Sequence, residues 1–413
     1  MRTCDVVVVG GGIGGASLAT ALASDGLDVV VVEASRRYED RVRGESMMPW
    51  GVKEARELGV EDILLAAGAH RAPAWLHYDN QVPVQMTIDN PIPVGMIVPE
   101  VTGSLNLRHP DACTALAAAA VASGADLFRG AQEVSVTAGS SPTVTFQSAD
   151  GPVELTARLV VGADGRNSAV RRQLGIELQR QAEVHMIAGL LLDGVADLPE
   201  ECDFLAGEGD LFMAAFQQGE GRIRVYLCPG LEQRHRFSGP EGMAEFMRSS
   251  AFACLPFGDA LAAGRPAGPL AAYPGDDSWT EQPFVEGAVL VGDAAGWNNP
   301  VIGQGLSIAM RDARTVRDIV RGGDLGPGAF GSYATERLER MRRLRAAATF
   351  MGAAFAEDSE DRAARRARFF EMQQAEPLML GMLMAVFGGP ETGPPEAFDG
   401  RLLATLRGGG AGG

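Results

Sequence analysis

The hydrophobic pattern at the N-terminus predicts a strand, a tight turn, a helix and a second strand. Residues 5–9 carry four consecutive valines, which is typical of a strand buried on both faces of a parallel sheet. Glycines follow, then strong helix formers at 16–24, and a second valine run at 28–32. This order predicts a β-α-β unit.

Downstream, β-rich and helical patterns alternate. Prolines punctuate residues 81–103, which favours short antiparallel strands joined by turns. An alanine-rich helix is predicted at 111–122, and a second helix at 306–320 follows a buried strand at 288–291. Further strands are predicted within 132–161, 184–193 and 210–227.

These patterns predict an α/β protein with a Rossmann-like nucleotide-binding domain, an inserted mixed β-sheet domain and a helical C-terminal segment. We expect the nucleotide-binding domain to be discontinuous, comprising residues 1–70, 104–180 and 275–325. The β-rich domain is expected at 71–103 and 181–274, and the helical segment at 326–413.

Composition narrows the classes of partner. A net charge of -17 argues against nucleic acid and anionic membrane surfaces as partners. The five cysteines are scattered and odd in number, so neither a disulfide framework nor a zinc site is expected, and a reducing cytoplasm fits best. No apolar run reaches the roughly 18 residues that span a bilayer. Residues 378–387 are predicted to form a buried or interface helix, and no metal site is predicted.

A glycine-rich turn after the first strand predicts a dinucleotide site. Gly10, Gly12 and Gly15 satisfy GxGxxG. They allow the turn, the approach of a pyrophosphate and close helix–strand packing, and the helix N-terminus attracts phosphate. Glu33 ends the next strand, where a carboxylate binds the ribose hydroxyls.

Two later segments separate FAD from NAD. Residues 289–295 read VLVGDAA and precede Gly303–Gln304–Gly305, and residues 160–171 read VVGADGRNSAVR. Together with the glycine turn, these segments resemble the FAD-dependent monooxygenases of the p-hydroxybenzoate hydroxylase type. These are the class A flavin monooxygenases, to which squalene epoxidases and flavin halogenases are related. The resemblance covers about three quarters of the chain, and the absence of a second GxGxxG after a strand also fits this family.

The resemblance implies a set of FAD-binding residues. In the family, the aspartate at position 293 binds the ribityl or pyrophosphate part of FAD, and the helix after it points at the pyrimidine edge of the flavin. Arg43 is the flavin-proximal residue for which the resemblance implies a catalytic role. The full set of predicted cofactor residues is Gly10, Gly12, Ile13, Gly14, Gly15, Glu33, Arg43, Arg108, Val134, Asp164, Asp293, Gly303, Gln304, Gly305 and Leu306.

The substrate side departs from the family pattern. Gly296 replaces a frequent histidine, Asn298–Asn299–Pro300 replaces a proline pair, and Ser307 replaces a frequent asparagine. These residues are expected over the flavin, so the substrate cannot be carried over from phenol hydroxylases. The predicted pocket residues are Met186, Phe212, Met213, Phe216, Tyr226, Asn299 and Pro300.

The function implied by the resemblance is oxygen insertion. NAD(P)H would reduce FAD, and a flavin C4a-hydroperoxide formed with O2 would hydroxylate or epoxidise a small organic substrate, expected to be aromatic or polyketide-like. We expect a monomer or homodimer. Alternatives are an alkene reductase of the geranylgeranyl reductase kind, a flavin halogenase and a non-catalytic flavin-binding protein. The halogenase is disfavoured for two reasons: Arg43 stands where a halogenase needs a lysine, and no WxWxIP motif occurs. The nearby Lys53 is interpreted as a surface residue and does not replace that lysine.

Overall fold

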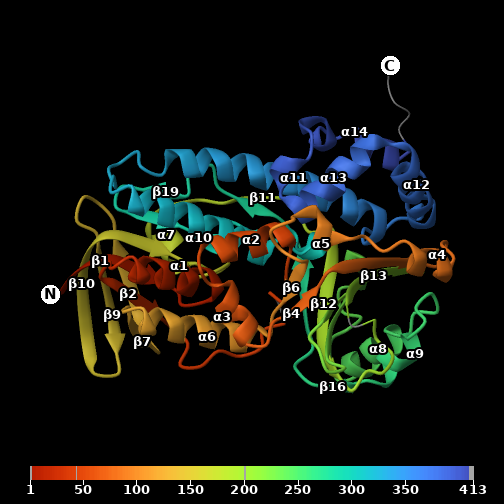
Figure 1. The fold of residues 1–413 in the computed structure, drawn as a ribbon, viewed down its shortest axis with the longest axis horizontal. Helices are drawn as coiled ribbons and strands as arrows, with labels where there is room; N and C mark the ends of the chain where they lie inside the picture. Colours follow the sequence, from red (N-terminus) through yellow and green to blue (C-terminus); the bar gives the residue numbers. More distant parts are fainter. Residues whose placement is uncertain (1, 43, 200, 409–413) are drawn as a thin grey trace.

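Two sheets stand side by side in the computed structural model, which describes residues 2–42, 44–199 and 201–408 (Figure 1). The N-terminal sheet has the order β19-β20-β10-β1-β2-β7, with β9 beside β10 and β8 beside β9. Neighbours from β20 to β7 run parallel. Its strands are β1 (Arg2–Val9), β2 (Val29–Glu33), β7 (Asp126–Arg129), β8 (Gln132–Thr137), β9 (Thr143–Ser148), β10 (Gly151–Gly162), β19 (Phe284–Val285) and β20 (Ala288–Leu290).

Both faces of this parallel sheet are buried. Val6 and Val8 of β1 belong to the core formed with three helices, whereas Val7 and Val9 pack on the other face with residues of β8 and β9. The helices on the first face are α1 (Ile13–Ser24), α6 (His109–Ala122) and α10 (Gly305–Arg321). The valine runs therefore predicted the buried β-α-β unit correctly.

The second sheet is mixed and has the order β16-β12-β15-β14-β13-β5, with β17 also paired to β12. Only β5 and β13 run parallel. The strands are β5 (Ala74–Asp79), β12 (His185–Asp193), β13 (Cys202–Glu208), β14 (Leu211–Gln217), β15 (Ile223–Cys228), β16 (Arg265–Pro266) and β17 (Ala271–Gly275). The helices α8 (Gly242–Ser249) and α9 (Gly258–Ala263) lie over one face, on the lower right of Figure 1.

Smaller elements connect the two sheets. A three-stranded sheet links β3 (Ser46–Met47), β6 (Ser104–Asn106) and β4 (His70–Ala72). A pair joins β11 (Gln179–Arg180) to β18 (Ser278–Trp279). The remaining short helices of the first half are α2 (Pro49–Glu57), α3 (Glu61–Ala66) and α7 (Ala169–Gln173). β4 and β17 run across two of the predicted domain boundaries, at residues 70–71 and 274–275.

One sequence prediction is wrong. Residues 81–103 were expected to form antiparallel strands, but they contain α4 (Val84–Asp89) and α5 (Val94–Ile97), with only an isolated bridge from Trp75 to Ile92. Pro83 and Pro93 occupy the N-cap positions of these helices. Proline is well tolerated where a helix begins, because the N–H it lacks has no partner there.

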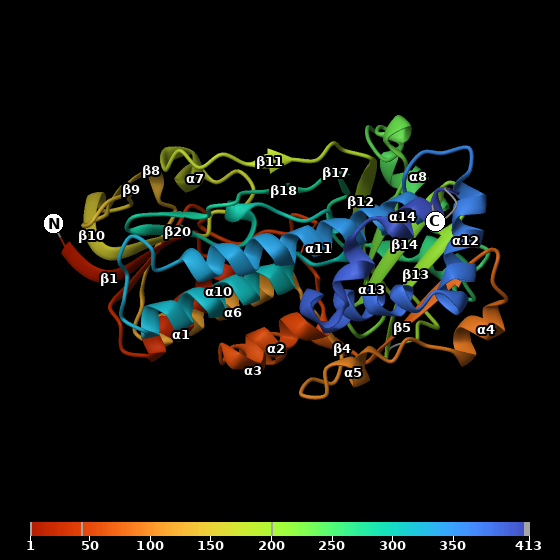
Figure 2. The ribbon, with the colours of Figure 1, turned by 90° about the horizontal axis from the view of Figure 1, so that it is seen from above.

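The C-terminal helices cover the remaining face of the second sheet. They lie at the upper right of Figure 1, and α11 runs beside α10 in Figure 2. Their bounds are α11 (Gly331–Phe355), α12 (Arg362–Ala375), α13 (Pro377–Gly388) and α14 (Arg401–Leu406). Five single-turn 3-10 helices complete the chain: η1 (Leu231–Gln233), η2 (Gly292–Ala295), η3 (Pro300–Ile302), η4 (Pro390–Thr392) and η5 (Pro395–Phe398).

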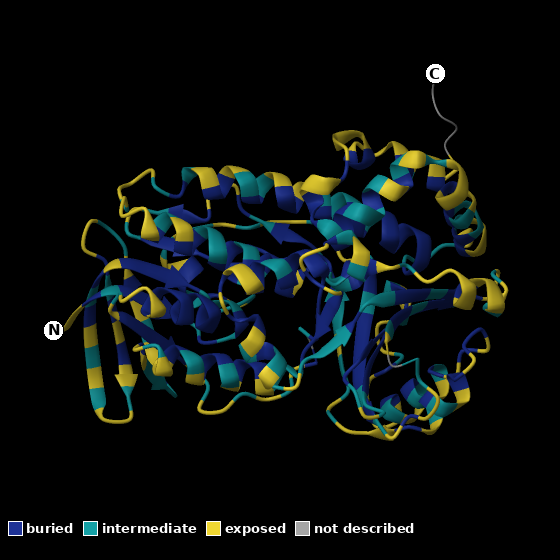
Figure 3. Cartoon of the chain, viewed as in Figure 1, coloured by how far each residue is buried: buried dark blue, intermediate teal, exposed yellow. Residues whose placement is uncertain are grey.

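Burial follows this arrangement. In Figure 3 the strands of both sheets are mostly dark blue, whereas exposed residues gather on outer helix faces and loops. Helix α13 contains the predicted buried segment 378–387, and five of its residues are buried. No helix in the described part of the chain combines the length and apolar character needed to cross a bilayer.

Candidate functional site

The N-terminus of α1 forms an open cradle. Gly10 has φ +108°, and a side chain there would strike the backbone of Ala163. A Cβ on Gly15 would lie 2.0 Å from the Gly10 carbonyl oxygen, so close packing also excludes any side chain there. By contrast, a Cβ on Gly12 would meet no atom within 4 Å, and no side chain caps the helix. The first N–H groups of α1 are thus free to bind an anion.

Glu33 lies beside this cradle at the end of β2. Its carboxylate accepts hydrogen bonds from the backbone N–H of Gly11 (2.7 Å) and of Ser35 (2.6 Å). The Tyr38 hydroxyl donates to the Gly11 carbonyl and secures the same turn. Glu33 is therefore held next to the glycine turn, the position from which a carboxylate reaches an adenosine ribose.

A second open helix N-terminus faces the same pocket. After η3, the chain turns through Gly303 (φ +63°) into α10, which no side chain of the described residues caps. A Cβ on Gly305 would meet no atom within 4 Å. Gly303, Gly305 and Leu306 all line the pocket that Gly12 also lines. The positive end of the α10 dipole can stabilise a negatively charged ring edge.

The two aspartates predicted to bind cofactor have different surroundings. Asp293 lines the pocket and forms an ion pair with Arg166, with Nε 3.3 Å from Oδ2. Asp164 instead caps α7, accepting hydrogen bonds from the Ser168 hydroxyl and from the backbone N–H of Ala169. The pocket is lined next to Asp164 by its neighbours at 163 and 165, not by Asp164 itself.

The segment 160–171 also braces the segment 289–295. The guanidinium of Arg171 is almost fully buried, and its Nη1 donates to the carbonyl of Ala294 at 3.1 Å. The two segments that carried the family resemblance are thus in direct contact, although about 120 residues separate them.

Four other predicted cofactor residues are not seen to offer a free side-chain group to the pocket. Arg43 lies outside the described residues. Arg108 donates from Nη2 to the Gln218 carbonyl (3.2 Å), and Val134 accepts from Gln173 Nε2 (2.9 Å); neither lines the pocket. Gln304 lines the pocket, but its amide is committed to protein partners.

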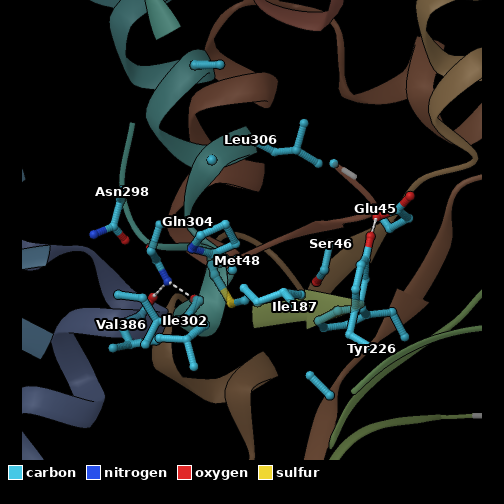
Figure 4. A pocket seen from close by; sticks show the side chains of 18 of the residues that line it. Glu45, Ser46, Met48, Ile187, Tyr226, Asn298, Ile302, Gln304, Leu306 and Val386 are labelled. Carbon is cyan, nitrogen blue, oxygen red and sulfur yellow. Dashed lines mark hydrogen bonds between the residues drawn. The ribbon is translucent and has the colours of Figure 1, made fainter. Parts of the chain in front are cut away.

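Gln304 acts as a structural tie behind the α10 N-terminus. It is fully buried, accepts a hydrogen bond from Trp50 Nε1 (2.9 Å), and donates from Nε2 to the Ile302 carbonyl (2.7 Å) and the Val386 carbonyl (3.2 Å). Figure 4 shows the amide between Ile302 and Val386. The side chain therefore joins the loop before α10 to helix α13.

The second sheet supplies an apolar extension of the pocket. Along β14, Phe212, Ala214 and Phe216 line it, whereas Met213 and Ala215 belong to the core on the opposite face. This alternation is the period of two expected in a strand. Of the predicted pocket residues, Phe212, Phe216, Tyr226 and Pro300 line the pocket. Met186, Met213 and Asn299 are not among the lining residues.

The side chains of Met213 and Asn299 pack and bond within the protein interior. Met213 is fully buried in the core beneath α8 and α9. Asn299 is also buried, and its side-chain oxygen accepts a hydrogen bond from the Val301 N–H at 3.1 Å. Predicting the adjacent residues Phe212 and Met213 both as pocket residues overlooked that successive side chains of a strand point to opposite faces.

Sequence reasoning missed the contribution of the C-terminal helices. Met351 of α11, Phe369 of α12 and Phe387 of α13 line the pocket, and β5 adds Trp75 and His77. Nothing in their spacing distinguishes these residues from ordinary core, so only the tertiary structure identifies them.

Polar groups at the pocket wall are buried and only partly paired, since Glu45 Oε1, Arg224 Nε and His77 Nε2 have no hydrogen-bond partner among the described residues. The hydroxyl of Tyr226 donates to Glu45, and Glu45 Oε1 lies 3.4 Å from Arg224 Nε; Figure 4 shows the first two pointing at one another. Burial raises the pKa of the Glu45 carboxyl, opposed by Arg224. Burial lowers the pKa of His77 to about 4, so this imidazole is neutral at pH 7. Across the described ranges, no three His, Cys, Asp or Glu side chains cluster as a metal site would require.

Comparison with known proteins identifies the family of this site. Residues 3–348 match the model of a family described as FAD binding domain. Mouse (Mus musculus) squalene monooxygenase is 24% identical over 328 residues, which cover 77% of this chain and 54% of that protein. The chain thus spans about half the length of that relative.

Two further similar proteins are matched over a larger share of their own length. Digeranylgeranylglycerophospholipid reductase 2 of Methanothermobacter thermautotrophicus is 27% identical over 331 residues, covering 76% of this chain and 77% of the reductase. The structure of aklavinone-11 hydroxylase in ternary complex with FAD and aklavinone superposes with a TM-score of 0.69 at 21% identity. That match covers 88% of this chain and 71% of the hydroxylase. At this identity, the structural match supports the fold alone.

Proposed function

The chain belongs to the FAD binding domain family, with FAD as its cofactor, and from that premise we propose that it is an FAD-dependent monooxygenase. Using NAD(P)H and O2, it would hydroxylate or epoxidise a small, largely apolar substrate of aromatic or polyketide-like character. Bound FAD would supply the redox chemistry and the activation of oxygen, so the protein needs to supply only binding, orientation and electrostatics.

The residues that would hold FAD fit its parts. The uncapped N-terminus of α1, open at Gly12, suits a pyrophosphate, and Glu33 beside it suits the adenosine ribose. Asp293 would bind the linker between pyrophosphate and flavin. The open N-terminus of α10 at Gly305 would stabilise negative charge on the pyrimidine edge of reduced flavin. Arg43 is proposed to lie against the flavin.

The apolar wall would keep the reaction dry and orient the substrate. Phe212 and Phe216 from β14, together with Phe387 from α13, offer apolar and aromatic surface with little competing polarity. Tyr226, held by Glu45, would present a fixed hydrogen-bonding group to a substrate oxygen. Excluding water prevents oxidising equivalents from being lost without product.

One observation carries this proposal. One pocket is lined by Gly12 of the α1 cradle, by Gly305 at the N-terminus of α10 and by Phe216 of the second sheet. A cofactor that reaches from the α1 cradle to the α10 N-terminus would present its ring to the apolar extension. We also propose that the protein works in the cytoplasm and that NAD(P)H donates the electrons.

The test is oxygen incorporation. FAD-loaded protein is mixed with NADH or NADPH and a panel of polycyclic phenols and acyclic isoprenoids under 18O2. We expect one substrate to yield a product that carries a single 18O atom, detected by mass spectrometry, with O2 and NAD(P)H consumed in equal amounts. Two results would refute the monooxygenase. One is a product that takes its new oxygen from 18O-labelled water in a parallel reaction under unlabelled O2, and the other is full activity without O2.

A second candidate is reduction of an alkene. It is favoured by the similarity to the reductase from Methanothermobacter, which extends over more than three quarters of both chains. In this case an isoprenoid would gain two hydrogens under anaerobic conditions with reduced FAD, and no 18O would be incorporated. A halogenase is less well supported because Lys53 lies on α2 and pairs with Glu100.

A further inference from the structure

Arg345 on α11 is a half-buried cation for which the described part of the chain provides no hydrogen-bond acceptor. Among the described residues, its guanidinium takes part in no hydrogen bond and no ion pair, and Nη1 is fully buried. The ring of Trp279 packs against it, with Cζ 3.8 Å from the ring centroid. A buried guanidinium nitrogen without an acceptor is costly, because its lost hydration is not replaced. Nε and Nη2 also have no acceptor in the described chain, but they are not fully buried and can therefore take one from a ligand.

The neighbouring carboxylates do not fill this role. Asp277 influences Arg345 electrostatically, but its Oδ1 already accepts hydrogen bonds from Asn298 Nδ2 (2.7 Å) and the Asn299 N–H (2.8 Å). Asp399 is paired with Arg401 at 2.7 Å. The charge at Arg345 therefore remains available to a ligand.

Arg345 borders a cavity of about 310 Å³, separate from the flavin pocket. Thr349 lies one turn further along α11 and accepts a hydrogen bond from Gln181 Nε2 at 3.2 Å. Gln181 and Asp399, the latter paired with Arg401, also line the cavity, and the rest of its wall is apolar and includes Phe350, Met382 and Leu402. No residue lines both this cavity and the flavin pocket. Figure 2 shows the helices α11, α13 and α14 that enclose it.

This combination selects one ligand chemistry. A guanidinium binds a carboxylate through two parallel N–H···O bonds, and the planar Trp279 ring fixes the guanidinium from one side. The apolar walls gain from burying a hydrocarbon body, which a bare inorganic anion lacks. We propose that this cavity is a binding site for an amphipathic carboxylate with an apolar body of about eight carbons.

The site borders the reaction pocket without being part of it. Phe350 and Met382 line the cavity, while the next residues, Met351 and Leu383, line the flavin pocket. A ligand in the cavity would therefore steady the two helices that form a wall of that pocket. The proposal holds whether or not the enzyme is a monooxygenase.

Octanoate binding to the FAD-loaded protein, measured by calorimetry, tests the proposal. We expect saturable binding of octanoate, at least about tenfold weaker binding of the uncharged octan-1-ol and of the tail-less acetate, and no change in the flavin absorbance. Arg345→Gln should weaken octanoate binding about tenfold or more. Arg248→Gln, which removes an exposed arginine on α8, should leave it unchanged.

Three results would each overturn the proposal. Equal octanoate binding by wild type and R345Q would place the ligand elsewhere, and a flavin spectral shift would place it in the flavin pocket. Acetate binding as tight as that of octanoate would indicate an adventitious anion site.

If R345Q does not fold, as judged by thermal melting, the variant Ala346→Phe tests the proposal instead. This variant fills the cavity and should abolish octanoate binding while Arg345 is kept.

Discussion

At the scale of single residues, the two glycines that flank the first turn of α1 have opposite reasons for being glycine. Gly15 is required by the protein, because a side chain there would collide with the Gly10 carbonyl. Gly12 has open space around it, and its backbone is extended, a conformation that alanine adopts freely. Packing among the described residues therefore does not require glycine at this position, and the open backbone suits the proposed cofactor.

This difference predicts distinct phenotypes. Gly12→Ala should change the free energy of unfolding of the apoprotein by less than about 1 kcal/mol, while weakening FAD binding at least tenfold. Gly15→Ala should destabilise the apoprotein itself. Chemical denaturation and flavin fluorescence titration measure the two effects. Unaltered FAD affinity in G12A would contradict the assignment of the cradle.

Asp203 on β13 is a second residue whose environment has a measurable consequence. It is fully buried, and its Oδ1 accepts hydrogen bonds from Asn106 Nδ2 (2.7 Å) and the Gln217 N–H (3.0 Å). Burial raises the pKa of this carboxyl to about 7. A group whose pKa is raised in the folded state favours folding at low pH, and this contribution is lost as the pH rises through the folded value.

We therefore predict that wild type loses stability between pH 4 and about pH 7 relative to Asp203→Asn. The loss should be on the order of 3–4 kcal/mol, because the asparagine stays neutral throughout. Denaturation with urea at several pH values measures the difference. Parallel pH profiles for the two proteins would show that the Asp203 carboxyl ionises normally.

At the scale of elements, strand β14 separates two environments. Ala214 lines the flavin pocket, whereas Ala215, the next residue, is fully buried in the core under α8 and α9. The strand thus lines the pocket of the proposed reaction on one face and forms the core of the second sheet on the other, and its two faces can be altered separately.

Matched substitutions exploit this geometry. Ala214→Leu should leave the free energy of unfolding within about 1 kcal/mol of wild type. It should lower turnover of the substrate found in the 18O assay at least tenfold, because the added side chain occupies pocket space. Ala215→Leu should cost about 1–3 kcal/mol through overpacking and retain the substrate KM. If both variants lose stability alike, the proposed division of faces is wrong.

At the scale of the whole molecule, the C-terminal helices reach back to the nucleotide-binding half. Asp312 of α10 is completely buried between Arg337 (3.0 Å) and Arg340 (2.7 Å) of α11. Arg337 also donates to the carbonyls of Ala295 and Gly296, each at 2.9 Å. The same helix that lines the substrate pocket through Met351 therefore holds the loop carrying Asp293.

Breaking this link should affect both stability and cofactor. Asp312→Asn leaves buried Arg337 without a compensating charge and leaves Arg340 only the partly exposed Glu336 (3.0 Å), so it should cost about 3–5 kcal/mol, with weaker FAD retention. Asp318→Asn, a half-exposed acid on the same helix, should change stability by less than about 1 kcal/mol. Denaturation curves and the flavin-to-protein absorbance ratio give the two measurements. An effect of D312N no larger than that of D318N would contradict the proposed link.

The sequence by itself determined the local chemistry of the nucleotide-binding half. Valine runs fix strands buried on both faces, and the glycine pattern fixes the turn, the helix start and the position of Glu33, since all of these depend on neighbours within about 30 residues. The order of the three motifs along the chain is also enough to indicate FAD as the cofactor.

Only the tertiary structure decided which side chains share the pocket. The face on which Met213 or Phe216 lies depends on strand register, and the short helices of residues 84–97 pack beside β5 of the second sheet. Contacts between Gln304 and Val386, or between Arg171 and Ala294, join elements distant in sequence. No local spacing encodes such contacts, because they arise when separate elements pack together and bury their polar groups jointly.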